Sequence, residues 1–377
     1  MSVRINGTTG VTTPNLTATT KVTTADLANT GNYNGGQLGN RNLVINGAMV
    51  FDQRNSASAI SSLGQYTTYT LDRWQYYSDQ AGKFSFQQNQ SSVTPPAGFT
   101  KYLGLTSLSA YSLGANETVS ISQHVEGFNC AQLNWGTSNA KTVSLSFWVR
   151  SSLTGTFSGV LAGGQNYIYT YDISSANTWE YKTITVPGST TGTWNTGNTS
   201  GVRVFFTLGY GSGQVGTANA WQSADFAASG SVQVIGTSGA TFQITGVQLE
   251  VGNTATPFEH KSYGDELVKC QRYYEIIGNW SSTSQFYAFP IFKARSMSIG
   301  IPVHFRVQKR ATPSITSYDR LGTTTGVFTQ ISNGTNLAIQ YGPSSDVNGV
   351  YRTQHATQPV SVTESAYGLK ITVDAEL

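Results

Sequence analysis

Apolar and polar residues alternate along short segments that fill the chain from about residue 41 to residue 260. In TVSLSFWVR (142–150) the apolar residues share one parity, and Trp148 and the polar residues share the other. VRVFFTL (202–208) repeats this pattern, with Arg203, Phe205 and Thr207 opposite an apolar set. Because successive side chains of a strand point to opposite faces, each segment predicts an antiparallel strand with one buried face.

Clusters of Gly, Asn, Ser and Thr separate roughly eight such strands, a spacing typical of a two-sheet sandwich of jelly-roll type. The segment TFQITGVQLEV (241–251) changes parity partway along its length. Phe242 and Ile244 lie in one register, Val247 and Leu249 lie in the other, and Gly246 stands where the register changes. We therefore expect a glycine bulge that returns the apolar side chains to the buried face.

One helix is expected, and it divides the chain. It starts at Ser262 with Asp265 three positions on, a partial capping box, and it places Leu267, Cys270 and Tyr274 on one side. We assign residues 261–275 to this linker helix and residues 276–377 to a C-terminal β domain. In the clearest strand of that domain, apolar and polar residues alternate from Met297 to Val307, and Pro302 indicates an edge strand or a bulge. The chain ends with another alternating segment.

The tight turns expected in the C-terminal domain are Asn333-Gly334 and Asn348-Gly349, and its last strand carries Leu369, Ile371 and Val373. The predicted fold class is therefore all-β: a jelly-roll β-sandwich over 41–260, a short helix, and a second, smaller β-sandwich domain.

Residues 1–40 are rich in Thr, Asn and Gly and short of large apolar side chains, so they cannot form a core of their own. We interpret this segment as an extended N-terminal arm for attachment or assembly, held by a partner or a sister subunit. The alternative is a terminal strand that joins the main sheet through Val3 and Ile5.

Charged residues make up only 11% of the chain, whereas about 25% is usual. The surface must therefore be wetted mainly by neutral polar side chains. A formal net charge of +3 is too small to indicate a nucleic-acid partner. The basic group from Arg306 to Arg310 is better explained as a solvated strand end.

Two cysteines, Cys130 and Cys270, are too few for a secreted disulfide framework, so we expect free thiols. The N-terminus lacks the apolar core of a signal peptide, and the chain has no apolar run of about 18 residues. We expect folding in a reducing cytoplasm and no membrane insertion.

Catalytic and metal-binding motifs are missing from the sequence, and no catalytic or metal-ligand residue is predicted. The four histidines are scattered without zinc-ligand spacing, and there is no nucleophile elbow or phosphate-binding loop. Calcium would suit a jelly roll, but no sequence feature supports it. A glycosidase needs two carboxylates in one cleft, and the candidates offer no reason to be paired; they are Asp72, Glu126, Glu250 and Glu259.

The aromatic residues carry more information. Tyr167, Tyr169 and Tyr171 alternate along one strand, and Trp148 occupies the polar face of another. An exposed aromatic row of this kind stacks on the C–H face of a sugar while neighbouring Asn, Gln and Ser bind its hydroxyls. These four residues are the candidate glycan-binding residues. The alternative, which the frequency of buried aromatic residues favours, is that the tyrosine row faces the second sheet or another subunit.

Several segments resemble the tail-fibre-like and virion structural proteins of tailed bacteriophages, especially marine and cyanobacterial ones. The resemblance covers about residues 42–275 and rests on the order of its segments. These are NLVINGAMVFDQR (42–54), YTLDRWQYY (69–77), LSFWVRSSLTGTFSG (145–159), NTWEYKTITVPG (177–188) and GATFQITGVQLEVGNTATPFEHKSYGDELVKCQRYYE (239–275). IPVHFRVQKRATPSITSYD is similar to the strand that begins the family's variable, distal C-terminal domain.

The resemblance implies a carbohydrate-binding-module-like jelly roll, homotrimeric assembly and a place on the outside of the virion. The first hypothesis is therefore a non-enzymatic phage fibre protein that mediates attachment to the host surface. Residues 1–40 would dock to other virion proteins, and the C-terminal domain, as the distal tip, would bind a host-surface glycan. The chain would be made in the host bacterial cytoplasm.

Two rival hypotheses remain. The first is a head fibre or capsid decoration protein built on the same sandwich. The second is a tail-borne polysaccharide depolymerase, which would need a paired-carboxylate cleft that the sequence does not show.

Overall fold

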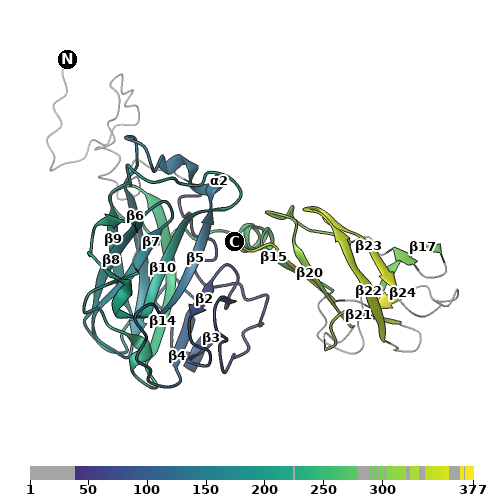
Figure 1. Ribbon diagram of the computed structural model, residues 1–377, viewed down its shortest axis with the longest axis horizontal. Helices are drawn as coiled ribbons and strands as arrows, with labels where there is room; N and C mark the ends of the chain where they lie inside the picture. The colour runs from purple at the N-terminus through teal and green to yellow at the C-terminus, as the bar shows by residue number, and fades with distance from the viewer. Residues whose placement is uncertain are drawn as a thin grey trace, which may run out of the picture.

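A computed structural model describes most of the chain (Figure 1). The described residues are 39–223, 226–278, 288–290, 292–295, 298–300, 303–319, 323–330, 336–355, 366–368 and 370–377. A large β-sandwich and a smaller β unit lie side by side, with α3 and β15 between them. The proposed N-terminal arm lies outside the described residues, apart from Gly39 and Asn40.

One layer of the sandwich is a seven-stranded sheet in the order β1-β2-β5-β10-β7-β8-β12. The strands are antiparallel to their neighbours. Their bounds are β1 Thr68–Tyr69, β2 Gln75–Ser78, β5 Thr118–Glu126, β10 Ser200–Tyr210, β7 Gly155–Ala162, β8 Asn166–Ile173 and β12 Trp221–Gln222.

The second layer is a five-stranded antiparallel sheet in the order β3-β4-β14-β6-β9. Its strands are β3 Phe84–Gln88, β4 Leu103–Ser107, β14 Thr241–Val251, β6 Val143–Ser151 and β9 Glu180–Val186. Aromatic side chains from both sheets meet in the core, where the Phe206 ring lies 4.9 Å from that of Phe147 and 6.5 Å from that of Phe242. The all-β sandwich expected from the alternation is therefore confirmed.

The expected inward residues of β6 and β10 belong to this core. The bulge expected in β14 is also present, because its pairing with β6 shifts register between Thr245 and Gln248. Gly246 lies there at φ +62°, a left-handed conformation that favours glycine. A Cβ atom on Gly246 would approach the Phe99 ring to 2.7 Å.

The outer face of the seven-stranded sheet is partly covered by the chain itself. β11 (Val215–Gly216) and β13 (Ala227–Ala228) form a small parallel pair. Ala228 and Phe226 pack on Phe205, which the sequence placed on a polar face and which is buried here. Short helical turns join the strands: α2 Gly127–Cys130, η1 Gln90–Ser92, η2 Ala131–Leu133, η3 Ser212–Gln214 and η4 Val234–Gly236.

Helix α3 (Tyr263–Gln271) begins where the sequence predicts it. The Ser262 hydroxyl caps it by accepting a hydrogen bond from the Asp265 backbone N–H at 3.2 Å. Its Cys270 packs with Ile45 and Phe51 of the sandwich, so the helix lies against the sandwich flank. Tyr274 was expected on the helix but lies in β15, because the helix ends three residues earlier.

The C-terminal unit contains a three-stranded sheet, β15-β25-β20, and an eight-stranded one. The strands of the first are β15 Tyr274–Ile277, β25 Lys370–Asp374 and β20 Ser314–Tyr318. Those of the second are β16 Ala288–Pro290, β24 Ala366–Gly368, β21 Val327–Gln330, β22 Asn336–Ser345, β23 Gly349–His355, β18 Ser298–Gly300, β17 Phe292–Arg295 and β19 Val303–His304.

Within the strand expected from Met297 to Val307, the described residues include β18 and β19, which both pair with β23. The turn expected at Asn348-Gly349 is confirmed, since the Asp346 carboxylate accepts hydrogen bonds from both backbone N–H groups, at 2.6 Å and 3.2 Å. Ile371 and Val373 are buried in β25 as expected. The Asn333-Gly334 turn, Pro302 and Leu369 lie outside the described residues.

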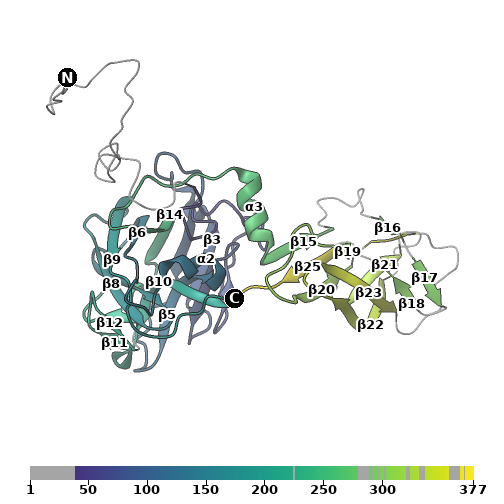
Figure 2. The ribbon, with the colours of Figure 1, turned by 90° about the horizontal axis from the view of Figure 1, so that it is seen from above.

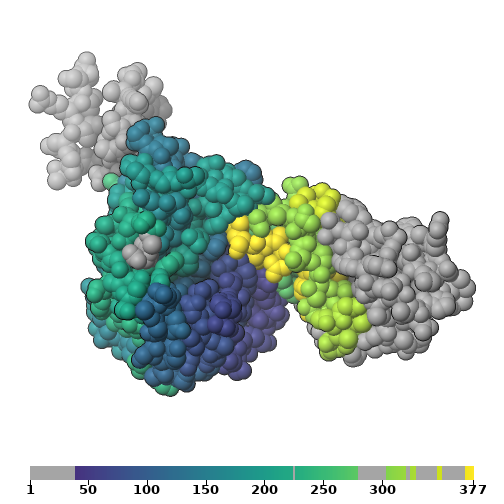
Figure 3. Space-filling model, viewed as in Figure 1, coloured from purple at the N-terminus to yellow at the C-terminus, as the bar shows by residue number. Residues whose placement is uncertain are grey.

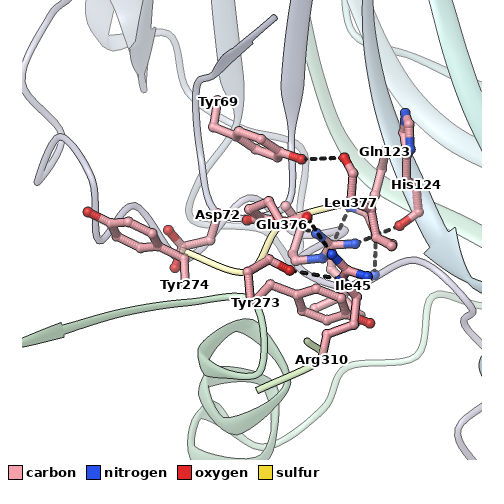
Figure 4. A network of polar contacts seen from close by, with 12 residues as sticks. Ile45, Tyr69, Asp72, Gln123, His124, Tyr273, Tyr274, Arg310, Glu376 and Leu377 are labelled. Atoms are coloured by element: carbon pink, nitrogen blue, oxygen red, sulfur yellow. Dashed lines mark hydrogen bonds and ion pairs between the residues drawn. The ribbon is translucent and has the colours of Figure 1, made fainter. Parts of the chain in front are cut away.

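Residues 374–377, here called the tail segment, cross from the C-terminal unit onto the sandwich (Figure 3). Figure 4 shows part of the network of polar contacts around Glu376 and Leu377 of this segment. Glu376 is paired with Arg73, and Asp374 with Arg54 at 2.9 Å. Arg310 donates to two tail carbonyls at 2.8 Å each.

Both cysteines are free, as expected, and both are buried. Burial raises the pKa of the Cys130 thiol to about 12, so this thiol is protonated at neutral pH. Among the helices of the described residues, none is long and apolar enough to cross a membrane.

Candidate functional site

The structure buries the tyrosine row. Tyr167, Tyr169 and Tyr171 lie on β8 and point into the core between the sheets, with exposed fractions of 5%, 0% and 5%. The Tyr169 hydroxyl donates to the Phe205 carbonyl at 2.6 Å, and burial raises its pKa well above the ordinary value. These rings have no face free for a sugar, so the alternative, that the row faces the second sheet, holds.

The neighbours of the tyrosines carried a signal for this orientation. The opposite parity of β8 holds Asn166, Ile168, Thr170 and Asp172, three of them polar, although Ile168 is buried in a cluster with Phe205 and Ala228. A strand that presents amide, hydroxyl and carboxylate groups on one face turns its other face inward.

Trp148 keeps a partly exposed side chain on the outer face of the five-stranded sheet. The strand register places it directly opposite Tyr181 of β9, and the two rings lie 5.3 Å apart. Tyr181 is 42% exposed, one of the larger exposed fractions for an aromatic residue in the described chain. The candidate residue Trp148 therefore belongs to an aromatic pair at the surface.

Three loop residues extend this pair. The Phe99 ring lies 5.1 Å from Phe258 and 5.3 Å from His260. Phe99 and Trp148 come together above Gly246, since both rings border the space that a Cβ on this glycine would fill. We call the five residues the aromatic strip; they are Tyr181, Trp148, Phe99, Phe258 and His260.

Hydrogen bonds fix the two loops that carry the outer part of the strip. The Thr245 hydroxyl donates to the Lys101 carbonyl at 2.7 Å, close to Phe99 in the chain. The Glu250 carboxylate accepts from the Thr256 backbone N–H at 2.8 Å and from its hydroxyl at 2.7 Å, which anchors the loop before Phe258. The aromatic strip is therefore held in place before any ligand arrives.

The charged side chains of β6 and β9 beside the strip are engaged with other groups. Lys182 is paired with Glu180 at 2.6 Å. The Arg150 guanidinium donates to the Gln243 side chain at 2.5 Å and to the Asn177 carbonyl at 2.9 Å. Flanking Thr183 and Thr185 are exposed on β9. This combination of aromatic faces and neutral hydrogen-bonding groups suits an uncharged polyhydroxylated ligand.

The four carboxylates considered from the sequence hold other parts of the structure. Glu250 anchors a loop, Glu259 accepts from the Asn42 backbone N–H at 2.9 Å, and Glu126 is bound by Arg272 and Tyr273. Asp72 accepts from Gln53, and burial raises its pKa to about 6. Each carboxylate is thus engaged separately.

No group of three His, Cys, Asp or Glu residues that could hold a metal ion occurs among the described residues, for calcium or for any other ion.

Sequence reasoning found one member of the strip, Trp148, and missed four. Tyr181 was detectable, because it has the opposite parity to Ile184 and Val186 on the same strand. Phe99, Phe258 and His260 lie in loops, where alternation gives no signal, and only the tertiary fold brings them together.

Comparison with known proteins gave weak structural likenesses only. No family model matches the chain, and no curated protein matches it. A tailspike protein 4 enzymatically active domain of bacteriophage CBA120 is 12% identical, with a TM-score of 0.32, over 56% of this chain and 21% of that one. The present chain thus matches about a fifth of the tailspike domain.

Two carbohydrate-binding modules are also similar. TmCBM61, solved with β-1,4-galactotriose, is 12% identical with a TM-score of 0.26, over 47% of this chain and 88% of that one. A family 11 module from Clostridium thermocellum, solved with a β-1,3-1,4-mixed-linked tetrasaccharide, is 12% identical with a TM-score of 0.26, over 52% and 100%. Likenesses at this level establish neither a shared family nor a shared function.

Proposed function

We propose that this chain is a non-catalytic glycan-binding protein and that the aromatic strip is its glycan surface. The observation that carries the proposal is the surface pair of Trp148 and Tyr181, continued by Phe99 above Gly246. Flat rings cover the C–H face of a sugar, and the flanking threonines and amides bind hydroxyls. Beside the strip, Lys182 is paired with Glu180, and the Arg150 guanidinium is hydrogen-bonded to neutral acceptors.

The wider role rests on the sequence resemblance. We propose that the protein is a homotrimeric fibre of a tailed-phage virion, docked to other virion proteins through residues 1–40 and displayed outside the particle. Single contacts to a sugar are weak, but linking several chains raises avidity by about 10²–10⁴. Many of the C-terminal residues lie outside the described ones, so glycan binding by that domain stays a prediction.

Glycan binding is tested with the full-length protein on an array of neutral and acidic bacterial surface polysaccharides, followed by calorimetry with the best neutral oligosaccharide. Trp148→Ala and Tyr181→Ala are expected to weaken binding at least tenfold, since aromatic residues at the centre of a contact surface contribute about 2 kcal/mol or more. Tyr66→Ala is the matched control, because Tyr66 is 57% exposed elsewhere on the sandwich.

Equal losses in the Tyr66 and Tyr181 variants, or an unchanged affinity in both strip variants, would refute the assignment to the strip. Absence of binding to every glycan on the array would refute the glycan-binding function itself.

Two further measurements address the wider role. Gold-labelled antibody against residues 276–377 is expected at the tail or its fibres in electron micrographs of virions. Label spread over the head would instead favour a capsid appendage. Incubation of the protein with host polysaccharide is expected to release no reducing sugar, and release would show a depolymerase.

A further inference from the structure

A surface hollow of about 860 Å³ opens between α2, α3 and the segment that begins at Asn40. It lies apart from the aromatic strip, and none of the strip residues lines it. Its volume falls within the range of roughly 300–1,000 Å³ that is usual for small-molecule sites.

The hollow carries a local excess of positive charge. Its lining includes three cations, Lys141, Lys269 and Arg272, and one carboxylate, Glu126. Glu126 is already neutralised: Arg272 donates to both of its oxygens, at 2.6 Å and 2.9 Å, and the Tyr273 hydroxyl donates at 2.7 Å. In a chain whose formal net charge is only +3, two surplus lysines lining one hollow are a marked concentration.

The two lysines are available to a ligand. Lys141 is an exposed residue, and its ammonium has no hydrogen bond or ion pair with another described residue. Lys269 donates to the amide oxygen of Asn40 at 2.8 Å, which uses one of its three donor positions. Both ammonium groups can therefore donate charge-assisted hydrogen bonds to an anion.

Neutral groups complete the lining. Phe128 of α2 is 62% exposed, although a large aromatic ring is usually covered in a folded chain. Asn129 and Gln132 line the same hollow. The Gln132 amide N–H donates to the Asn129 carbonyl at 3.0 Å, which leaves its oxygen free to accept a hydroxyl.

We propose that this hollow binds an anionic saccharide, with a carboxylate or sulfate group on the sugar against Lys141 and Lys269 and the ring face against Phe128. The anionic group of the ligand would contact the two lysines, and the face of its sugar ring would cover the exposed Phe128 ring. The sugar hydroxyls would hydrogen-bond to the side-chain amides of Asn129 and Gln132. The inference goes beyond the neutral glycan of the aromatic strip, because it assigns a second surface and a second class of sugar.

The test is calorimetry on the full chain with four probes: oligogalacturonate, its methyl ester, a sulfated galactose oligosaccharide and inorganic sulfate. The methyl ester keeps the ring and removes the charge. At least one anionic oligosaccharide is expected to bind, at least about tenfold more tightly than the ester and than inorganic sulfate, with affinity that falls as sodium chloride is raised. Binding of oligogalacturonate would identify a carboxylate as the anionic group, and binding of the sulfated oligosaccharide would identify a sulfate.

Lys141→Gln and Lys269→Gln are each expected to weaken this binding about tenfold, and Phe128→Ala is expected to weaken it as well. Lys83→Gln is the control, since this lysine lies over the Tyr111 ring elsewhere on the sandwich. Melting temperatures of all variants establish that they are folded. Trp148→Ala is expected to leave the affinity for the anionic probe unchanged, which separates this site from the aromatic strip.

Several outcomes would overturn the proposal. These are the absence of binding by both anionic oligosaccharides up to about 10 mM, equal affinity for acid and ester, equal affinity for inorganic sulfate, and no effect of the lysine variants. A variant lacking residues 1–38 that binds a probe which the full chain does not bind would also overturn it, by showing that this chain's own N-terminal segment covers the hollow.

Discussion

The buried ion pair between Arg73 and Glu376 joins the C-terminal unit to the sandwich. Removing its carboxylate is the most direct test of this attachment. Both side chains are almost fully buried, with 1% and 4% exposed. The Arg73 guanidinium also lies 3.5 Å from the centroid of the Tyr273 ring and donates to the His124 carbonyl at 2.6 Å. Glu376→Gln keeps the shape of this side chain but removes the carboxylate that balances the buried guanidinium.

The expected cost is large because the cation stays behind. Removing one partner of a buried ion pair costs about 3–5 kcal/mol, whereas an exposed pair contributes about 0–1 kcal/mol. Glu376 also contacts a second cation, Arg54, at 3.4 Å, so the substitution removes that contact as well, although Arg54 keeps Asp374 as a partner. The local opening equilibrium of the tail segment is therefore expected to rise by about two to four powers of ten.

Hydrogen exchange measures this opening at a reporter amide. The Ala375 N–H donates to the Tyr273 carbonyl at 2.7 Å across the junction, so it exchanges only when the tail segment separates. In Glu376→Gln its exchange is expected to accelerate at least a hundredfold. The double variant Arg73→Met with Glu376→Met is expected to recover part of the loss, since it leaves no buried charge unpaired.

Acceleration below tenfold in Glu376→Gln would refute the reasoning. So would a double variant that is as destabilised as the sum of the two single changes, because the two residues would then act independently.

Three further predictions follow from single residues. Gly246→Ala is expected to destabilise the sandwich by about 1–3 kcal/mol in urea unfolding and to weaken glycan binding at the strip. The variant forces a side chain into a left-handed φ and places its Cβ 2.7 Å from the Phe99 ring. An unchanged urea concentration at the unfolding midpoint would contradict this. Asp72 has a raised pKa in the folded protein, so its protonated form stabilises the fold below about pH 4, and this stabilisation is lost as the pH rises through about 6. The loss in the free energy of unfolding is at most about 3 kcal/mol. Asp72→Asn is expected to remove this part of the pH dependence of the melting temperature. Tyr169→Phe is expected to lower the free energy of unfolding by about 1–3 kcal/mol, because it removes the hydroxyl that donates to the buried Phe205 carbonyl. Tyr171→Phe is expected to be neutral or stabilising, since the buried Tyr171 hydroxyl has no partner among the described residues. Similar losses in both variants would show that the hydroxyl contacts do not decide stability.

The sequence predicted the sandwich well because its strands each bury one face. The alternation in β6 and β10, the parity change at Gly246 and the cap at Ser262 are all local patterns, and each is found where it was expected. The pattern was less informative for β8, where aromatic residues on one parity are compatible with either face of the sheet. Its opposite face, polar at Asn166, Thr170 and Asp172 but apolar at Ile168, favours the orientation with the tyrosines inward.

The contacts that form the candidate sites are non-local, which is why the sequence did not reveal them. Phe99 and Phe258 are separated by more than a hundred residues and meet only because their loops cross the outer face of one sheet. The junction is equally non-local, since Glu376 pairs with Arg73 across most of the chain. Neither pair has a periodicity or a spacing that single-sequence reasoning could use.

The distribution of charge separates the two proposed binding surfaces. At the junction Glu376 is paired with Arg73, and beside the aromatic strip Lys182 is paired with Glu180. At the hollow between α2 and α3, the Lys141 ammonium is left over. Salt screens charge but has little effect on ring stacking. Raising the salt concentration should therefore weaken binding at the hollow and leave binding at the strip nearly unchanged, which distinguishes the two surfaces in a single protein without any substitution.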